Sequence, residues 1–130
     1  MASSPGRARA RRCRGAHGAI GRPRPTDDPT AHAEVEAVRD AGWRTDWADC
    51  VLVTTMTPCW MCAGMMRFLG LGAVAYGDGA SWPTDAATGL AAAGIRVIDL
   101  GSAEAVAMFD DWLAGTPASW SQPTATGELG

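Results

Sequence analysis

The hydrophobic pattern of the chain changes near residue 29. Before that point the sequence is rich in Arg, Gly, Pro and Ser, and Ile20 is its only large aliphatic residue besides Met1. This stretch has neither a helical nor a strand period, which predicts a disordered leader over residues 1–29. After it, apolar runs alternate with polar or glycine-rich turns, which predicts an ordered domain over residues 30–116 and a polar tail over residues 117–130.

Four helices and three strands are predicted in the ordered part. Thr30 and Thr57 are suitable N-caps for the first two helices. Gly42 and Gly70 are placed to end these helices. The first strand lacks alternation, as expected of a strand that is covered on both faces. The predicted helices are 31–41, 58–69, 84–93 and 103–114, and the predicted strands are 50–55, 73–76 and 95–100.

The order of these elements indicates the fold class. Helices and strands alternate throughout, which predicts a three-layer α/β/α domain with a largely parallel sheet. A chain of 130 residues fits one such domain. No apolar run approaches the ~20 residues of a membrane span, so no membrane partner is expected.

Two short motifs carry the candidate chemistry. His32-Ala-Glu34 precedes the first predicted strand, and Pro58-Cys59-Trp-Met-Cys62 follows it. The two cysteines are three residues apart, so their thiols leave one face of a helical first turn. Unpaired N–H groups and the helix dipole favour thiolates there. In a parallel α-β-α unit both helix N-termini reach one end of the sheet, which predicts that His32 meets Cys59 and Cys62.

This ligand set is typical of a catalytic zinc site. One neutral and two anionic ligands leave the fourth tetrahedral position of Zn²⁺ open. Zinc lowers the pKa of water that it binds from ~15.7 to ~7 in a favourable site. Glu34 is two residues from His32 and projects in another direction, so it is the candidate for moving protons.

Other interpretations of the cysteines stay open. The Cys59/Cys62 pair could be a redox pair, a buried unreactive pair, or half of a structural zinc site completed by Cys13 and His17. The structural zinc site would leave Glu34 and Pro58 unexplained, and it would depend on a segment without a core. Cys50, inside an apolar run, is predicted to be part of the core.

From Asp28 to about Trp120 the chain resembles the fungal-type cytosine deaminases and their bacterial nucleoside-deaminase relatives, in the cytidine/deoxycytidylate deaminase superfamily. The matching stretches are residues 28–34, 54–64 and 70–77. The resemblance implies a zinc-dependent hydrolase that converts a nucleobase, above all cytosine to uracil, with release of ammonia. It also implies a homodimer, because family members are commonly dimers.

The same resemblance implies a set of substrate contacts. Trp82 matches an aromatic residue that lines the base pocket, and Trp120 matches a C-terminal Trp that closes over it. The backbone N–H groups of Ala33 and Cys59 match groups that fix the base and the reacting oxygen. These residues are therefore the expected substrate-binding positions.

The chain also departs from the family pattern. The N-terminal helix and first hairpin of the family are expected to be missing, because the Arg/Pro-rich leader replaces them. A base-binding Asn is absent, since the chain contains no Asn, and Trp120 is followed by Ser-Gln-Pro in place of an acidic residue. Guanine deamination, adenosine deamination in tRNA, and a truncated, inactive relative are therefore alternatives.

Charge is distributed unevenly along the chain. Residues 1–29 hold seven arginines and two aspartates, a net charge of +5, whereas residues 30–130 carry −8. An acidic domain disfavours nucleic acid as a partner. A nucleic-acid-binding module that acts through Arg7–Arg24 is the competing non-enzyme interpretation. Met1–Arg14 lacks the apolar segment of a secretory signal, so a cytoplasmic location is expected.

Overall fold

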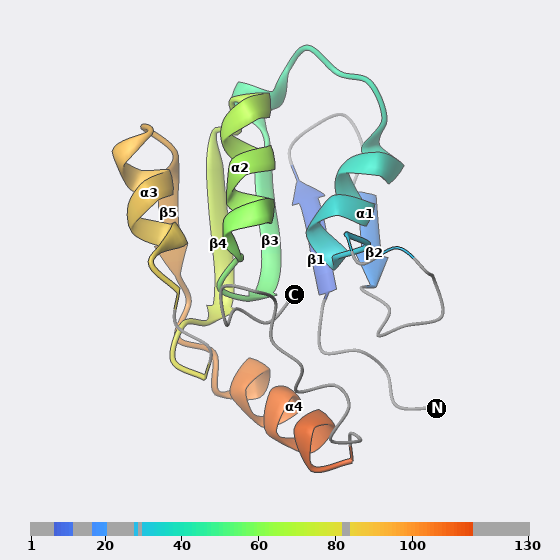
Figure 1. Cartoon of the computed structure of the whole chain (residues 1–130), viewed down its shortest axis with the longest axis vertical. Helices are drawn as coiled ribbons and strands as arrows, with labels where there is room; N and C mark the ends of the chain where they lie inside the picture. The colour runs from blue at the N-terminus through green and yellow to red at the C-terminus, as the bar shows by residue number, and fades with distance from the viewer. Residues whose placement is uncertain (1–6, 12–16, 21–27, 29, 82–83, 116–130) are drawn as a thin grey trace.

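The computed structural model describes residues 7–11, 17–20, 28, 30–81 and 84–115. Five strands form one sheet in the order β2-β1-β3-β4-β5, and helices are packed against it (Figure 1). The strands are β1 (Arg7–Arg11), β2 (His17–Ile20), β3 (Val51–Met56), β4 (Ala73–Asp78) and β5 (Arg96–Asp99). The helices are α1 (Ala33–Ala41), the 3-10 turn η1 (Trp47–Asp49), α2 (Trp60–Leu69), α3 (Ala86–Ala92) and α4 (Ala103–Ala114).

The parallel part of the sheet follows the predicted alternation. Strand β4 pairs in parallel with both β3 and β5, so Leu52 lies opposite Val74, which lies opposite Val97. Helices α2 and α3 are the crossover connections between these strands, as parallel pairs require. The mixed α/β class is confirmed, and the elements predicted after residue 30 are present with ends that differ by one or two residues.

The N-terminal hairpin differs from the prediction. Strands β1 and β2 pair antiparallel with each other, and β1 adds antiparallel to β3, with Ala10 opposite Leu52. The predictions of a disordered leader and of a missing hairpin are therefore wrong for these strands. The sequence Arg7-Ala-Arg-Ala-Arg11 has a period of two, which its arginine-rich composition concealed. Pairing with it satisfies the backbone edge of β3, which would otherwise be exposed.

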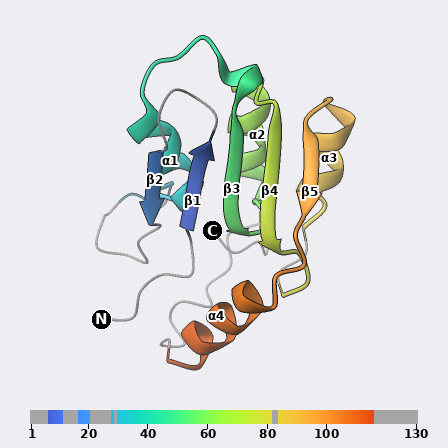
Figure 2. The same ribbon diagram turned by 180° about the vertical axis from the view of Figure 1, so that it is seen from behind.

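Three helices cover one face of the sheet. Helix α1 packs over β1 and β2, α2 lies over β3 and β4, and α3 lies beside β5; all three are behind the strands in the reverse view (Figures 1 and 2). The core lies between these helices and the sheet. Its largest fully buried apolar side chains are Leu52, Met66, Leu90 and Val74.

Helix α4 lies at the end of the sheet at which β4 finishes, apart from the other three helices (Figure 1). It packs against the end of β4, where a Cβ on Gly77 would lie 2.8 Å from the Cβ of Ala105. Thr54 and Tyr76 are paired on the side that carries α1 and α2, so Gly77, one residue further, faces the other way. Ser102 caps α4, since its Oγ accepts the N–H of Ala105. Among the described residues, no helix has the length and apolar character to cross a membrane.

Candidate active site

The two helices that carry the motifs begin later than predicted. His32 is the N-cap residue of α1 and Cys59 is the N-cap residue of α2, both with extended backbone. Thr30 and Thr57 do not cap these helices, because their hydroxyls bond elsewhere. The Thr30 hydroxyl donates to Oδ1 of Asp28 at 2.6 Å, and the Thr57 hydroxyl donates to the carbonyl of Asp78 at 3.4 Å. The motif residues themselves therefore occupy the helix starts.

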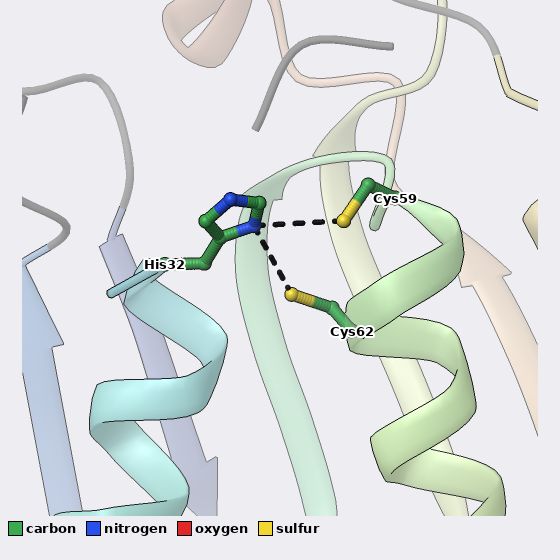
Figure 3. Close-up of side chains that lie close together, drawn as sticks. All are labelled: His32, Cys59 and Cys62. Carbon is green, nitrogen blue, oxygen red and sulfur yellow. Dashed lines mark hydrogen bonds between the residues drawn. The ribbon is translucent and has the colours of Figure 1, made fainter. Parts of the chain in front are cut away.

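His32, Cys59 and Cys62 come together at the end of the sheet where both helices start (Figure 3). Nδ1 of His32 lies 3.5 Å from Sγ of Cys59 and 3.4 Å from Sγ of Cys62. All three ligand atoms lie within 4.8 Å of one another. The structure thus brings together the residues of both motifs.

The spacing of these atoms fits Zn²⁺. Bonds of about 2.0 Å to nitrogen and about 2.3 Å to sulfur at a tetrahedral angle separate the two ligand atoms by about 3.5 Å. The observed separations of 3.5 and 3.4 Å match this value. Two buried cysteines and one histidine are also a donor set that zinc prefers. The chain can therefore hold Zn²⁺ with little movement of its side chains.

In the metal-free fold, the pKa values of Cys59, Cys62 and His32 are shifted in different directions. Hydrogen bonds from the Cys62 thiol and from His32 lower the pKa of Cys59 to about 4, so this residue is a thiolate at neutral pH. The bond to Cys59, followed by burial and by the charge of Glu34, raises the pKa of Cys62. The bond to Cys59 also raises the pKa of His32. One ligand is thus ionised before any metal arrives.

Glu34 lies beside the cluster without belonging to it. It is the second residue of α1, and its carboxylate interacts with the Cys62 thiol. Oε1 of Glu34 accepts a hydrogen bond of 3.2 Å from the hydroxyl of Thr54 in β3. Burial raises the pKa of Glu34. A carboxyl group with a raised pKa holds a proton more readily than an ordinary glutamate, which suits it to proton exchange beside a metal site.

Two polar residues near the starts of α1 and α2 are absent from the sequence-based prediction. Thr54 meets Glu34 across 20 residues of sequence. Asp78 ends β4, where its Oδ1 accepts the backbone N–H groups of Ala80 and Ser81 and so shapes the loop that leaves the strand. Asp78 lies at the carboxyl end of β4 and Thr54 in the second half of β3, and α/β domains commonly form their sites at the carboxyl ends of parallel strands. That rule is the signal that could have found them.

The predicted substrate contacts are placed only in part. Ala33 is buried as the first residue of α1, where its backbone N–H has no partner within the helix. Trp82 and Trp120 lie outside the described residues, so their contacts stay predictions. Cys13, needed for the alternative structural zinc site, also lies outside them. Cys50 is in the hydrophobic core, as predicted.

Comparisons with known proteins agree with this geometry. The family described as cytidine and deoxycytidylate deaminase zinc-binding region matches residues 9–78. The cytosine deaminase of Candida albicans is 26% identical over 93 residues, which are 70% of this chain and 61% of that protein. The guanine deaminase of Bacillus subtilis is 43% identical over 67 residues, which are 48% of this chain and 40% of that protein.

A solved guanine deaminase structure from Nitrosomonas europaea has a similar fold. Its TM-score is 0.67 at 25% identity, and the superposition covers 86% of this chain and 74% of that one. The chain spans 61% and 40% of the two curated relatives. The matched family region begins within β1, runs through both motifs and ends with β4, more than half of the chain. The chain therefore belongs to the cytidine and deoxycytidylate deaminase family.

Proposed function

We propose that this chain is a zinc-dependent hydrolase that removes the amino group of a nucleobase. The observation that carries the proposal is the placement of Glu34, a carboxylate with a raised pKa, beside the His32, Cys59 and Cys62 cluster. The reaction takes one water and one aminated base and gives the oxo base and ammonia. When bound, zinc would act as a Lewis acid that makes water nucleophilic near neutral pH.

Glu34 has the proton-transfer role in this proposal. Its carboxylate accepts a proton from the attacking water and gives protons to the ring nitrogen and to the departing amino group. His32, Cys59 and Cys62 hold the metal. The N–H groups of Ala33 and Cys59 point from helix N-termini, which favour groups that carry or develop negative charge. These roles need no residue outside the two motifs.

Cytosine is the substrate that we propose first. The match to a cytosine deaminase extends over 70% of this chain. Guanine is the second candidate, because the relative with 43% identity and the solved neighbour are guanine deaminases. Both bases carry an amino group on a carbon next to a ring nitrogen, so one site chemistry serves either. A homodimer stays a prediction from the family resemblance, and a cytoplasmic location stays a prediction from the sequence.

The test is ammonia release by the zinc-loaded full chain with cytosine and guanine in parallel. The Glu34→Gln variant should retain zinc and lose about 100-fold or more in kcat, as expected when a general acid–base group is removed. Glu36→Gln is the matched control, since Glu36 is on the same helix and pairs with Arg39. Turnover by Glu34→Gln close to that of the wild type would remove Glu34 from this role. Inactivity of the wild type on both bases would contradict the proposed function.

A further inference from the structure

Thr54 makes a contact that the proposed chemistry leaves unexplained. Its side chain is 4% exposed in the middle of β3, on the face that α1 and α2 cover. A buried hydroxyl needs a hydrogen-bond partner, and this one donates to Oε1 of Glu34 at 3.2 Å. Strand β3 therefore contacts the Glu34 carboxylate directly through the Thr54 hydroxyl.

The contact restricts a side chain that has several rotatable bonds. A glutamate at a helix start has access to several rotamers, and fixing one of them costs conformational entropy. Strand β3 is a rigid support, since it is paired on both sides, to β1 and to β4. The Thr54 hydroxyl binds one carboxylate oxygen of Glu34, and it makes no bond to the second oxygen. Sites held by such supporting bonds keep the precision that catalysis needs.

We propose that Thr54 is the positioning residue for Glu34, holding Oε1 so that Oε2 is directed to the metal site for proton transfer. Thr54 acts through Glu34 and does not touch the substrate. This inference rests on the proposed function, because it assigns a partner to the residue that moves the protons there. It adds a role in the site for β3, which also joins the two motif helices and pairs with β1 and β4 in the sheet.

A structural role predicts a different outcome for one substitution. Threonine is also a strong strand former, and Val has the same branched shape and a similar strand preference. If Thr54 only filled the sheet, Thr54→Val would preserve activity. If its hydroxyl positions Glu34, Thr54→Val removes that function and Thr54→Ser restores it. Thr55→Val is the matched control, because Thr55 is next in β3 and faces the opposite side of the sheet.

The experiment compares these three variants with the wild type as zinc-loaded full chains. Zinc content per chain should be the same in all four. For Thr54→Val we expect kcat to fall by about 10- to 100-fold with KM changed less than about threefold, since a small misplacement near the chemistry has effects of this size. Thr54→Ser should recover most of kcat, and Thr55→Val should stay close to the wild type. A kcat of Thr54→Val within about twofold of the wild type overturns the inference.

A second readout does not depend on turnover. In urea unfolding of the zinc-loaded protein, Thr54→Val should change the midpoint in the wild-type background and should have a smaller effect when Glu34 is already Ala, because the two side chains are coupled. Equal effects in both backgrounds overturn the contact. If the wild type deaminates neither base, the proposed function fails while this cycle still decides the contact. If the wild type is active and Thr54→Val is equally active, only the positioning role fails.

Discussion

His32 and Cys59 occupy the same place in two neighbouring helices, because each is the last extended residue before the first helical turn. Their side chains leave the helix starts toward each other, which brings Nδ1 and Sγ to 3.5 Å. The N-terminal end of a helix favours negative charge, so this position suits a thiolate ligand. The helix starts thereby assemble the metal site, and Cys62 on the first turn of α2 completes it.

The first prediction concerns metal content. The wild-type chain should hold about one zinc after removal of loosely bound metal, and Cys59→Ser should lose it. Loss of a residue that only hydrogen-bonds to a metal ligand lowers metal affinity by up to about 100-fold, so loss of a ligand itself should lower it further. Met66→Leu is the control, since Met66 is fully buried in α2 and does not belong to the cluster. Atomic emission on chelator-washed protein measures this. Full zinc in Cys59→Ser would contradict the ligand assignment.

The second prediction concerns protons released by metal binding. The pKa of Cys59 is lowered to about 4, so its proton is already gone, whereas the raised pKa of Cys62 keeps that thiol protonated. Above the pKa of His32, zinc should therefore release about one proton. Below it, His32 must also lose a proton, so zinc affinity falls further as the pH is lowered.

Calorimetry in buffers with different ionisation heats counts these protons. The Cys62→Ser variant should release fewer protons than the wild type under the same conditions. Equal proton release by both proteins would show that Cys62 does not exchange its proton for the metal. The pH dependence of zinc affinity should have the same sign in both, because His32 is present in each.

The third prediction concerns stability of the metal-free chain. Burial raises the pKa of Glu34, so between its unfolded and folded pKa values the folded state binds more protons than the unfolded state. Stability then falls as the pH rises through that window. Glu34→Gln does not ionise and still offers an oxygen to Thr54, so this variant should be more stable than the wild type at about pH 8, with a gap that closes near pH 4.

Urea unfolding at both pH values checks this expectation. Glu36→Gln, which loses a surface ion pair with Arg39, should show no such gain. A wild type that is the more stable protein at the higher pH would contradict the raised pKa of Glu34. If Glu34→Gln gains stability and loses activity, it follows the stability–activity trade-off that is common at functional sites.

The fourth prediction compares two glycines. A Cβ on Gly72 would collide with the backbone carbonyl of Ala48, whereas a Cβ on Gly64 in α2 would meet no atom within 4 Å. Gly72→Ala should therefore lower the free energy of unfolding by about 1–3 kcal/mol. Gly64→Ala should raise it by about 0.5–1 kcal/mol, because a helix interior favours Ala. Equal effects of the two changes on the urea midpoint would count against the packing around Gly72.

Much of this structure is predictable from local sequence. His32-Ala-Glu34 and Pro58-Cys59-Trp-Met-Cys62, with a strand between them, determine where the metal cluster forms, because parallel topology brings both helix starts to one end of the sheet. The turn glycines Gly42 and Gly70 end their helices as predicted. These features depend on short segments whose preferences agree with the fold.

Features that depend on distant pairing are not predictable in this way. The hairpin of β1 and β2 has few large apolar residues, and its strands are completed by backbone pairing with β3, some 40 residues away. The bond between Thr54 and Glu34 also joins distant segments. The predicted starts of α1 and α2 were too early, because Asp28 and Asp78 accept the hydroxyls of Thr30 and Thr57, which were expected to cap these helices. Competition for a hydroxyl is visible only in three dimensions.

The helices that carry the metal ligands stand on different parts of the sheet. Helix α1 rests on β1 and β2, whereas α2 rests on β3 and β4 (Figure 1). An ion shared by His32 and the two cysteines is therefore a cross-link between the N-terminal hairpin and the parallel strands. The affinity for zinc should then depend on whether strands β1 and β2 are in place under α1. An N-terminal deletion that spares every ligand should still weaken zinc binding, since it removes the support under α1.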